Sequence, residues 1–162
     1  MTGNHFYDAC RIFRHACAYL DCAKFCQNEP NSIVERYKWY TTPEITNTAF
    51  ACEIFMKALA FTASDKLPRG HELAKLWEVL TPQDQLGIKN EVYQIEGDMS
   101  EELFCEKLAS ISKAFDAWRY VYEKHGASVE LSFLRAFSEA LREYSCKKLY
   151  KRSWTQYTNQ SE

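Results

Sequence analysis

Apolar residues recur at steps of three and four along nearly the whole chain, and no stretch alternates cleanly with a period of two. Such spacing places apolar side chains on one face of an α-helix. The pattern therefore predicts an all-α fold. We expect a single up-and-down bundle of four to five helices over residues 1–154, followed by a polar, disordered tail over residues 155–162.

Two helix boundaries can be placed in the first third of the chain. The apolar stripe of the first helix, over about residues 5 to 27, consists of Phe6, Cys10, Phe13, Cys17 and Leu20. Thr42-Pro43-Glu44 has the order of capping residue, proline and acidic residue that begins a helix. We expect the second helix to start there, and residues 31–41 to form a connection draped over the bundle.

The remaining boundaries follow from similar signals. A short helix is expected over residues 71–80, and Thr81-Pro82 should begin another that ends near Gly97. Ser100 starts the most regular segment, which predicts one helix of about seven turns that runs through His125 to Gly126. Ser128 is expected to cap the last helix. Its inward face should carry Leu134, Phe137, Leu141 and Tyr144.

Composition narrows the classes of function. With 162 residues, 46% of them hydrophobic, the chain can bury a core without metals or disulfides. The net charge of -2 provides no global attraction to nucleic acid, so any such contact must come from a local patch. No apolar run approaches the roughly 20 residues that cross a bilayer. We expect a cytoplasmic protein without a membrane partner.

Cysteines and glycines give no sign of a cofactor. The seven cysteines form no C-x-x-C pair, and we expect them to be reduced, buried thiols. The five glycines lie too far apart to build a phosphate-binding loop. We therefore expect neither a metal site nor a bound cofactor.

Three stretches together resemble the HEPN family. Glu53 and Lys57 flank an apolar stripe, Gly70-His71-Glu72-Leu73 follows, and residues 115–125 read FDAWRYVYEKH. The resemblance implies a bundle of four or five helices that is usually a homodimer. Many members are metal-independent RNases of toxin–antitoxin or phage-defence systems. Others bind nucleotides or act as partners of a nucleotidyltransferase, which here would be an antitoxin.

In active members of that family an arginine is followed, after four to six residues, by a histidine. Arg119 and His125 fit this motif, with Tyr120, Tyr122 and Glu123 between them as expected substrate contacts. The residue after the arginine is usually small and polar, whereas here it is Tyr120. Arg119 would stabilise charge on the phosphorus, and His125 would transfer protons.

Helical geometry adds a condition to this catalytic interpretation. On one continuous helix, residues six apart point about 120° from each other. Arg119 and His125 would then reach a common phosphate only when two copies pack about a two-fold axis.

Structural roles compete with the catalytic ones. Arg119 could form an ion pair with Glu123 one turn away or with Glu53. His125 could complement the end of its helix. His71, just after Gly70, could be a capping or packing residue at the start of a helix.

A basic segment near the C-terminus is the second functional signal. Four cations, Lys147, Lys148, Lys151 and Arg152, are interleaved with Tyr150 and Trp154. Cations and exposed rings suit phosphates and unpaired bases, although the same residues could dock the C-terminus. The sequence thus favours an RNA- or nucleotide-binding protein with possible ribonuclease chemistry. The alternative is a catalytically inactive module that dimerises or binds a partner protein.

Overall fold

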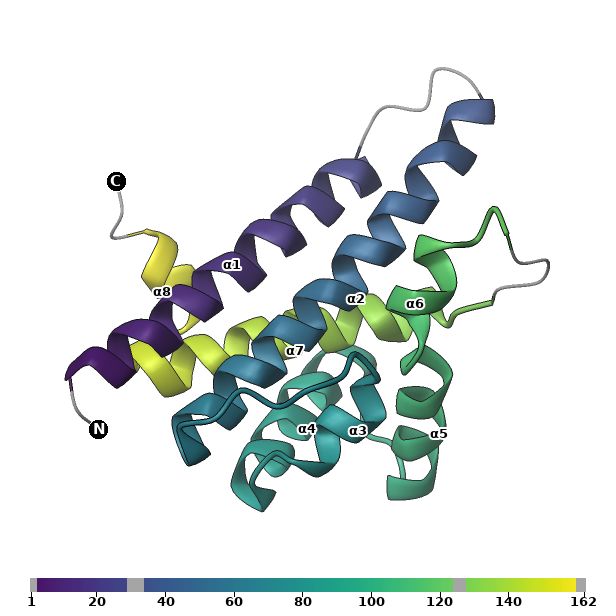
Figure 1. Ribbon diagram of the computed structural model, residues 1–162. Helices are drawn as coiled ribbons and strands as arrows, with labels where there is room; N and C mark the ends of the chain where they lie inside the picture. Colours follow the sequence, from purple (N-terminus) through teal and green to yellow (C-terminus); the bar gives the residue numbers. More distant parts are fainter. Residues whose placement is uncertain (1–2, 29–33, 124–127, 160–162) are drawn as a thin grey trace.

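The computed structural model describes residues 3–28, 34–123 and 128–159, and all the regular structure within them is helical (Figure 1). The helices are α1 (Gly3–Asn28), α2 (Val34–Ser64), α3 (Leu73–Glu78), α4 (Pro82–Glu96), α5 (Glu101–Ile111), α6 (Ala114–Arg119), α7 (Leu131–Tyr150) and α8 (Trp154–Thr158). The all-α prediction is confirmed. The expected up-and-down bundle of four to five helices is not confirmed. The long helix expected from Ser100 is divided into α5 and α6, and the short helix α8 follows α7.

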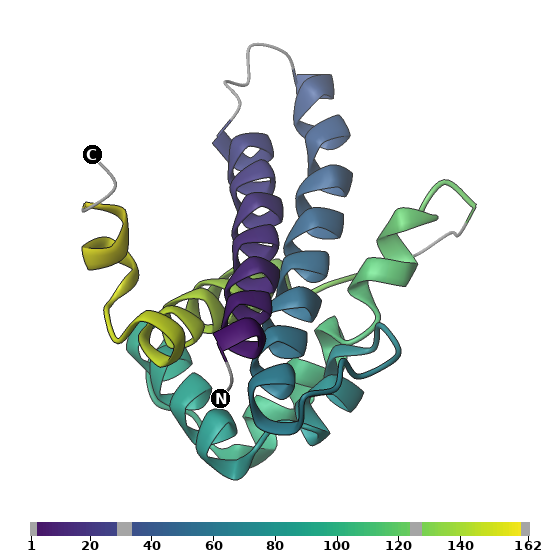
Figure 2. The same cartoon turned by 60° about the vertical axis from the view of Figure 1, so that its left-hand side comes forward.

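A long hairpin of α1 and α2 forms one side of the molecule. The two helices run antiparallel. The C-terminal end of α1 and the N-terminal end of α2 project beyond α3, α4 and α5 (Figure 2). The expected start of the second helix at Thr42 is wrong, because α2 already begins at Val34 and contains Pro43. A proline within a helix removes one backbone hydrogen bond. Packing of α2 along α1 outweighs this local cost.

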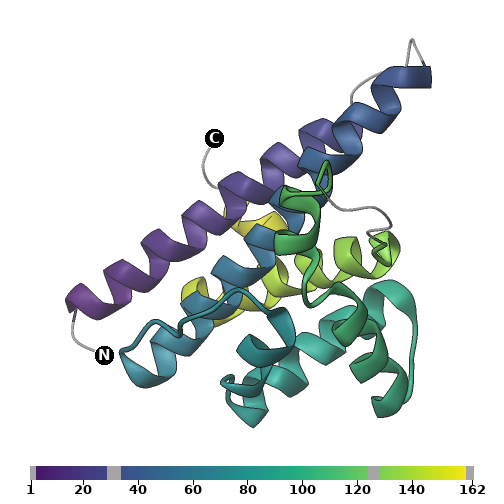
Figure 3. The same cartoon turned by 45° about the vertical axis from the view of Figure 1, so that its right-hand side comes forward.

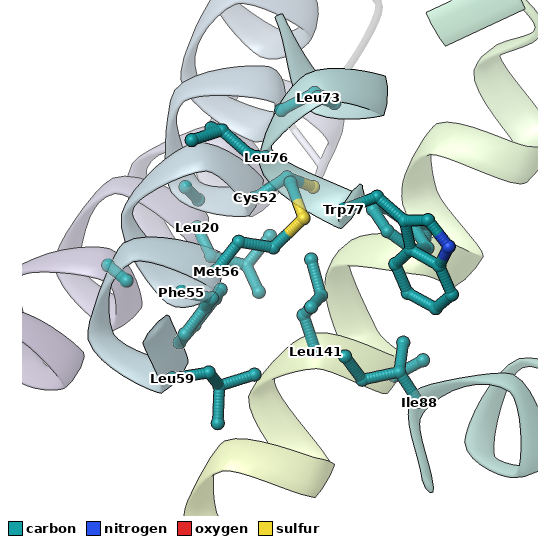
Figure 4. Close-up of a cluster of buried hydrophobic side chains, with 14 of the residues drawn as sticks. Leu20, Cys52, Phe55, Met56, Leu59, Leu73, Leu76, Trp77, Ile88 and Leu141 are labelled. Carbon is teal, nitrogen blue, oxygen red and sulfur yellow. The ribbon is translucent and has the colours of Figure 1, made fainter. Parts of the chain in front are cut away.

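The core lies where α2, α3, α4 and α7 meet (Figure 4). Met56 from α2 and Leu141 from α7 are fully buried there, with Trp77 from α3 and Ile88 from α4 beside them. Phe13 on α1 is also fully buried. The predicted inward positions in these helices are therefore largely confirmed.

Two expected inward positions differ. Phe6 at the start of α1 is exposed. Tyr144 on α7 is only half-buried, and its hydroxyl donates a hydrogen bond to Asp84 Oδ1 at 2.8 Å. The predicted buried positions are thus confirmed in the middle of each helix. They differ at a helix end and at a tyrosine, whose hydroxyl needs a polar partner.

All seven cysteines are free thiols, as expected. Cys10, Cys17, Cys52 and Cys146 are buried, but Cys22 and Cys105 are exposed, so the expectation of uniform burial is wrong.

Several helix boundaries are confirmed in detail. The Thr81 hydroxyl accepts a hydrogen bond from the Asp84 backbone N–H, and the Ser100 hydroxyl accepts one from Leu103. Gly97 ends α4 with a φ of 86°, a conformation that glycine adopts without strain.

The expected seven-turn helix is broken after Ile111. The Ser112 carbonyl accepts a hydrogen bond from the Leu73 backbone N–H at 3.0 Å, and its hydroxyl accepts one from Ala74 at 2.9 Å. Ser112 therefore satisfies free N–H groups at the start of α3 instead of continuing its own helix. The chain then forms α6 and leaves the helix after Arg119.

The C-terminal expectations also change. Ser128 does not cap α7, since the helix begins after Glu130, which makes no side-chain cap. The expected disordered tail contains α8, which begins with a capping box between Ser153 and Gln156. Tyr157 on α8 lies against Phe13, with ring centroids 6.3 Å apart.

Removing the Ser112 hydroxyl should destabilise the fold. In Ser112→Ala the N–H of Ala74 loses its partner, which should cost about 1 kcal/mol. Urea denaturation measures this change. Ser110→Ala is the matched control, because the Ser110 hydroxyl donates to the Lys107 carbonyl in its own exposed turn. Equal midpoints for the two variants would contradict the role given to Ser112.

Buried thiols should make stability fall at alkaline pH. Burial raises the pKa of Cys17 to about 12, whereas an unfolded cysteine ionises near ~8.5. The folded state thus favours the neutral thiol, and its contribution is lost as pH rises from ~8.5 toward the folded pKa. Between pH 9 and 10.5, the free energy of unfolding should fall by about 1–2 kcal/mol less in Cys17→Ala than in the parent protein. Urea titrations at the two pH values measure this difference. Cys22→Ala, at an exposed site, should keep the parent slope; matching slopes for all three proteins would refute the prediction.

Candidate functional site

The expected catalytic pair does not share one helix. Arg119 is the last residue of α6, and Tyr120 to Glu123 form turns. The residues Tyr120, Val121 and Tyr122 are β-branched or aromatic, which disfavours continuation of the helix. His125 lies outside the described residues. The angle of about 120° expected between Arg119 and His125 on one continuous helix therefore does not apply. The geometric reason for requiring a dimer is lost as well.

The Arg119 guanidinium lies on aromatic rings. Its Cζ is 4.8 Å from the centroid of Phe115 and 4.5 Å from that of Tyr120. The side chain remains 44% exposed. Planar guanidinium groups stack on rings and still present N–H donors at their edge, so this arginine can receive an anion.

Neither expected ion-pair partner holds Arg119. Within the described ranges, its ion pair is with Asp116, at 3.6 Å between Nη2 and Oδ1 on one face of α6. Both side chains are about half exposed, so the pair contributes little. Glu123 lies in the turn beyond α6, and Glu53 is occupied elsewhere.

The other expected contacts around Arg119 are at the surface. Tyr122 is 77% exposed, and Tyr120 and Glu123 are also exposed. Desolvation, followed by the neighbouring Glu123 carboxylate, raises the pKa of the Tyr122 hydroxyl. Tyr122 therefore stays neutral at physiological pH and offers an uncharged ring and a hydroxyl to a ligand.

Glu53 is the buried charge of this region. Its side chain is only 2% exposed and accepts a hydrogen bond from Lys57 Nζ at 2.8 Å. His71 Nδ1 lies 3.0 Å from both carboxylate oxygens. Since a carboxylate only accepts hydrogen bonds, Nδ1 carries the hydrogen. Of the two structural roles expected for His71, capping is wrong, because Glu72 is the N-cap of α3. His71 instead packs against Phe115 and reaches back to Glu53 on α2.

The sequence contained these residues without indicating their pairing. Eighteen residues separate Glu53 from His71. The segment between α2 and α3 runs back along α2 toward α6, and it passes Gly70 at a φ of 93° (Figures 1 and 3). The signal that could have found the pair is the buried position of a glutamate among apolar residues, which requires a partner from another segment.

Aromatic rings connect His71, Arg119 and α1 into one surface. Phe115 lies 5.8 Å from the His71 ring and stacks on Phe50 at 4.9 Å. Phe50 in turn meets Tyr19 edge-on at 4.6 Å. We call these five residues, Tyr19, Phe50, His71, Phe115 and Arg119, the α6 surface. It combines rings, a cation and an imidazole from four segments of the chain.

Two of the four cations in the C-terminal basic segment, Lys147 and Lys148, form ion pairs within the protein. Lys148 pairs at 2.5 Å with the buried Asp84. Lys147 lies 2.7 Å from Glu91 and 3.1 Å from Glu143. Burial alone would lower the pKa of Lys147, but hydrogen bonding to the two carboxylates raises it. These lysines stabilise the packing of α7 against α4.

The aromatic residues of this segment dock the C-terminus. Tyr150 and Trp154 pack against Phe13, with ring centroids at 5.7 and 6.2 Å. Arg142 covers the Trp154 ring at 4.5 Å. Lys151 and Arg152, the other two cations, are exposed. The docking interpretation therefore accounts for most of the segment.

No group of three or more His, Cys, Asp or Glu side chains is placed to hold a metal ion in the described part of the chain. Nor does that part contain a helix long and apolar enough to cross a membrane. Comparison of the chain with protein-family models, curated proteins and solved structures gave no match.

The tautomer of His71 can be measured directly. In the neutral ring, nitrogen-15 NMR should show hydrogen on Nδ1 and a bare Nε2, because Glu53 accepts from Nδ1. Glu53→Gln should weaken this preference. Glu44, like Glu53, is a buried glutamate of α2, and it pairs with Arg135 of α7. Glu44→Gln should leave the tautomer preference of His71 intact. Hydrogen on Nε2 in the parent protein would contradict the assigned geometry.

Proposed function

We propose that the chain is an RNA- or nucleotide-binding protein and that the α6 surface is where the ligand binds. The observation that carries the proposal is the half-exposed Arg119 guanidinium, which lies on Phe115 and Tyr120 with only a weak ion pair. Rings that stack on unpaired bases, next to a cation that meets phosphate, are the usual means of binding single strands.

The resemblance to the HEPN family extends this proposal. It supplies the RNA or nucleotide class of ligand, a homodimer and a metal-independent ribonuclease activity that involves Arg119 and His125. It also suggests a toxin–antitoxin or phage-defence setting with a nucleotidyltransferase partner. The order of the three sequence stretches supports these features.

The second candidate is an inactive interaction module. Large apolar side chains are more than half exposed at Phe25, Val79 and Leu86. Such residues could contact a partner protein. They lie on α1, at the end of α3 and on α4, however, and so form a less coherent site than the α6 surface.

Arg119→Ala should weaken binding of a fluorescently labelled single-stranded RNA about tenfold in anisotropy titrations. The loss combines one phosphate contact with part of a stacking platform. Arg119→Lys should recover only part of the affinity, because it keeps the charge without the planar group.

Arg11→Ala is the matched control for this experiment. Arg11 also pairs with an aspartate three residues earlier, Asp8, on an exposed helix face, but it lies on α1 outside the α6 surface. Its removal should change the affinity less than threefold. Equal losses for the two alanine variants, or no binding by the parent, would rule out this site.

A further inference from the structure

We propose that His71, held by Glu53, is the proton-transferring residue of the α6 surface and that its reaction is cleavage of RNA next to a 2′-hydroxyl. The inference deepens the proposed function and rests on it. It gives the acid–base role to His71, which belongs to the α6 surface, whereas the family resemblance gives that role to His125.

The contact with Glu53 fixes the orientation of the His71 imidazole. Both oxygens of Glu53 lie 3.0 Å from Nδ1, and Lys57 Nζ donates a hydrogen bond to Oε1 of the same carboxylate at 2.8 Å. With Nδ1 occupied as a donor, the neutral ring has its lone pair on Nε2. A carboxylate that fixes the tautomer of a histidine in this way is a general device for proton transfer.

The His71 side chain reaches the surface, unlike that of Glu53. The Glu53 side chain is 2% exposed, whereas His71 is 51% exposed. The imidazole therefore bridges a buried charge and the surface. A histidine that served only to neutralise Glu53 would be redundant, since Lys57 already pairs with the same oxygen at 2.8 Å.

His71 and Arg119 share Phe115 as a neighbour. The His71 ring centre lies 5.8 Å from the Phe115 centroid, and the Arg119 guanidinium carbon lies 4.8 Å from it. One phenyl ring thus carries a proton acceptor and an anion-binding group. Because Phe50 and Arg119 already lie on this ring, an RNA strand would bind beside it, across the exposed imidazole and guanidinium. In Figure 3 the segment that follows α2 and the helix α6 are seen beside α2.

The chemistry balances without a further reactant. Nε2 of His71 takes the proton of the 2′-hydroxyl, and the 2′-oxygen forms a bond to the adjacent phosphorus. The bond from phosphorus to the 5′-oxygen breaks, and the leaving oxygen takes a proton from the imidazolium or from water. Arg119 binds the non-bridging oxygens as charge develops on them. The products are a 2′,3′-cyclic phosphate and a 5′-hydroxyl end.

The decisive experiment measures binding and cleavage of one single-stranded RNA in the presence of a chelator. His71→Ala should lower the cleavage rate at least a hundredfold, a far larger change than the one it makes in the dissociation constant. His71→Asn should be equally inactive, although its amide can still donate to Glu53, which separates proton transfer from folding. An RNA with a 2′-deoxy sugar at the cleavage position should bind and remain intact.

The positioning role of Glu53 needs its own readout. Glu53→Gln should lower kcat about tenfold at nearly constant KM, because RNA contacts the imidazole and not the carboxylate. Glu44→Gln, again a buried glutamate of α2 with a cationic partner, should change kcat less than twofold.

The outcomes separate this inference from the proposed function. If the parent protein binds RNA but does not cleave it, or if His71→Ala cleaves at the parental rate, the inference is wrong and RNA binding stands. Loss of cleavage in His125→Ala with full activity in His71→Ala also overturns it. If the parent does not bind RNA at all, both proposals fail.

Discussion

The buried carboxylate of Glu53 is the constraint on which the candidate site depends. A charge that is 2% exposed is costly to bury unless it is paired, and two partners from different parts of the chain supply that pairing. Lys57 lies one turn further along α2. His71 comes from the segment before α3, so its hydrogen bond to Glu53 also ties that segment to α2. The His71 imidazole thus takes its position from an electrostatic requirement of the core.

Ser112 provides the second constraint, which places Arg119. By bonding to the first N–H groups of α3, it ends α5 and turns the chain toward α2. Phe115 on the short α6 can then stack on Phe50 of α2. An unbroken helix from Ser100 onward would have carried Phe115 and Arg119 along the axis of α5. The break therefore brings the arginine close to the glutamate–histidine pair.

Local signals in the sequence were enough to predict much of the fold. The all-α class, the caps at Thr81 and Ser100 and the stop at Gly97 each depend on neighbouring residues, and the structure confirms them. The start of α2 and the break at Ser112 depend on tertiary contacts. A proline inside a helix and a serine that caps a distant helix cannot be recognised from their own surroundings in the sequence.

The same distinction applies to the candidate site. The interest of Arg119 came from a motif within one segment, and its exposure on stacked rings agrees with a binding role. The pairing of Glu53 with His71 joins residues whose separation has no helical periodicity. Similarly, the basic run near the C-terminus looks like a patch in sequence, yet Lys147 and Lys148 pair with acidic residues on α4.

The most direct test of this account is a titration of the isotope-labelled protein with a short unpaired RNA, followed by NMR. The account predicts that the side-chain signals of Arg119 and His71 shift first and saturably, together with the ring signals of Tyr19. Shifts confined to the ends of α7 and α8, or no shifts at millimolar RNA, would contradict it.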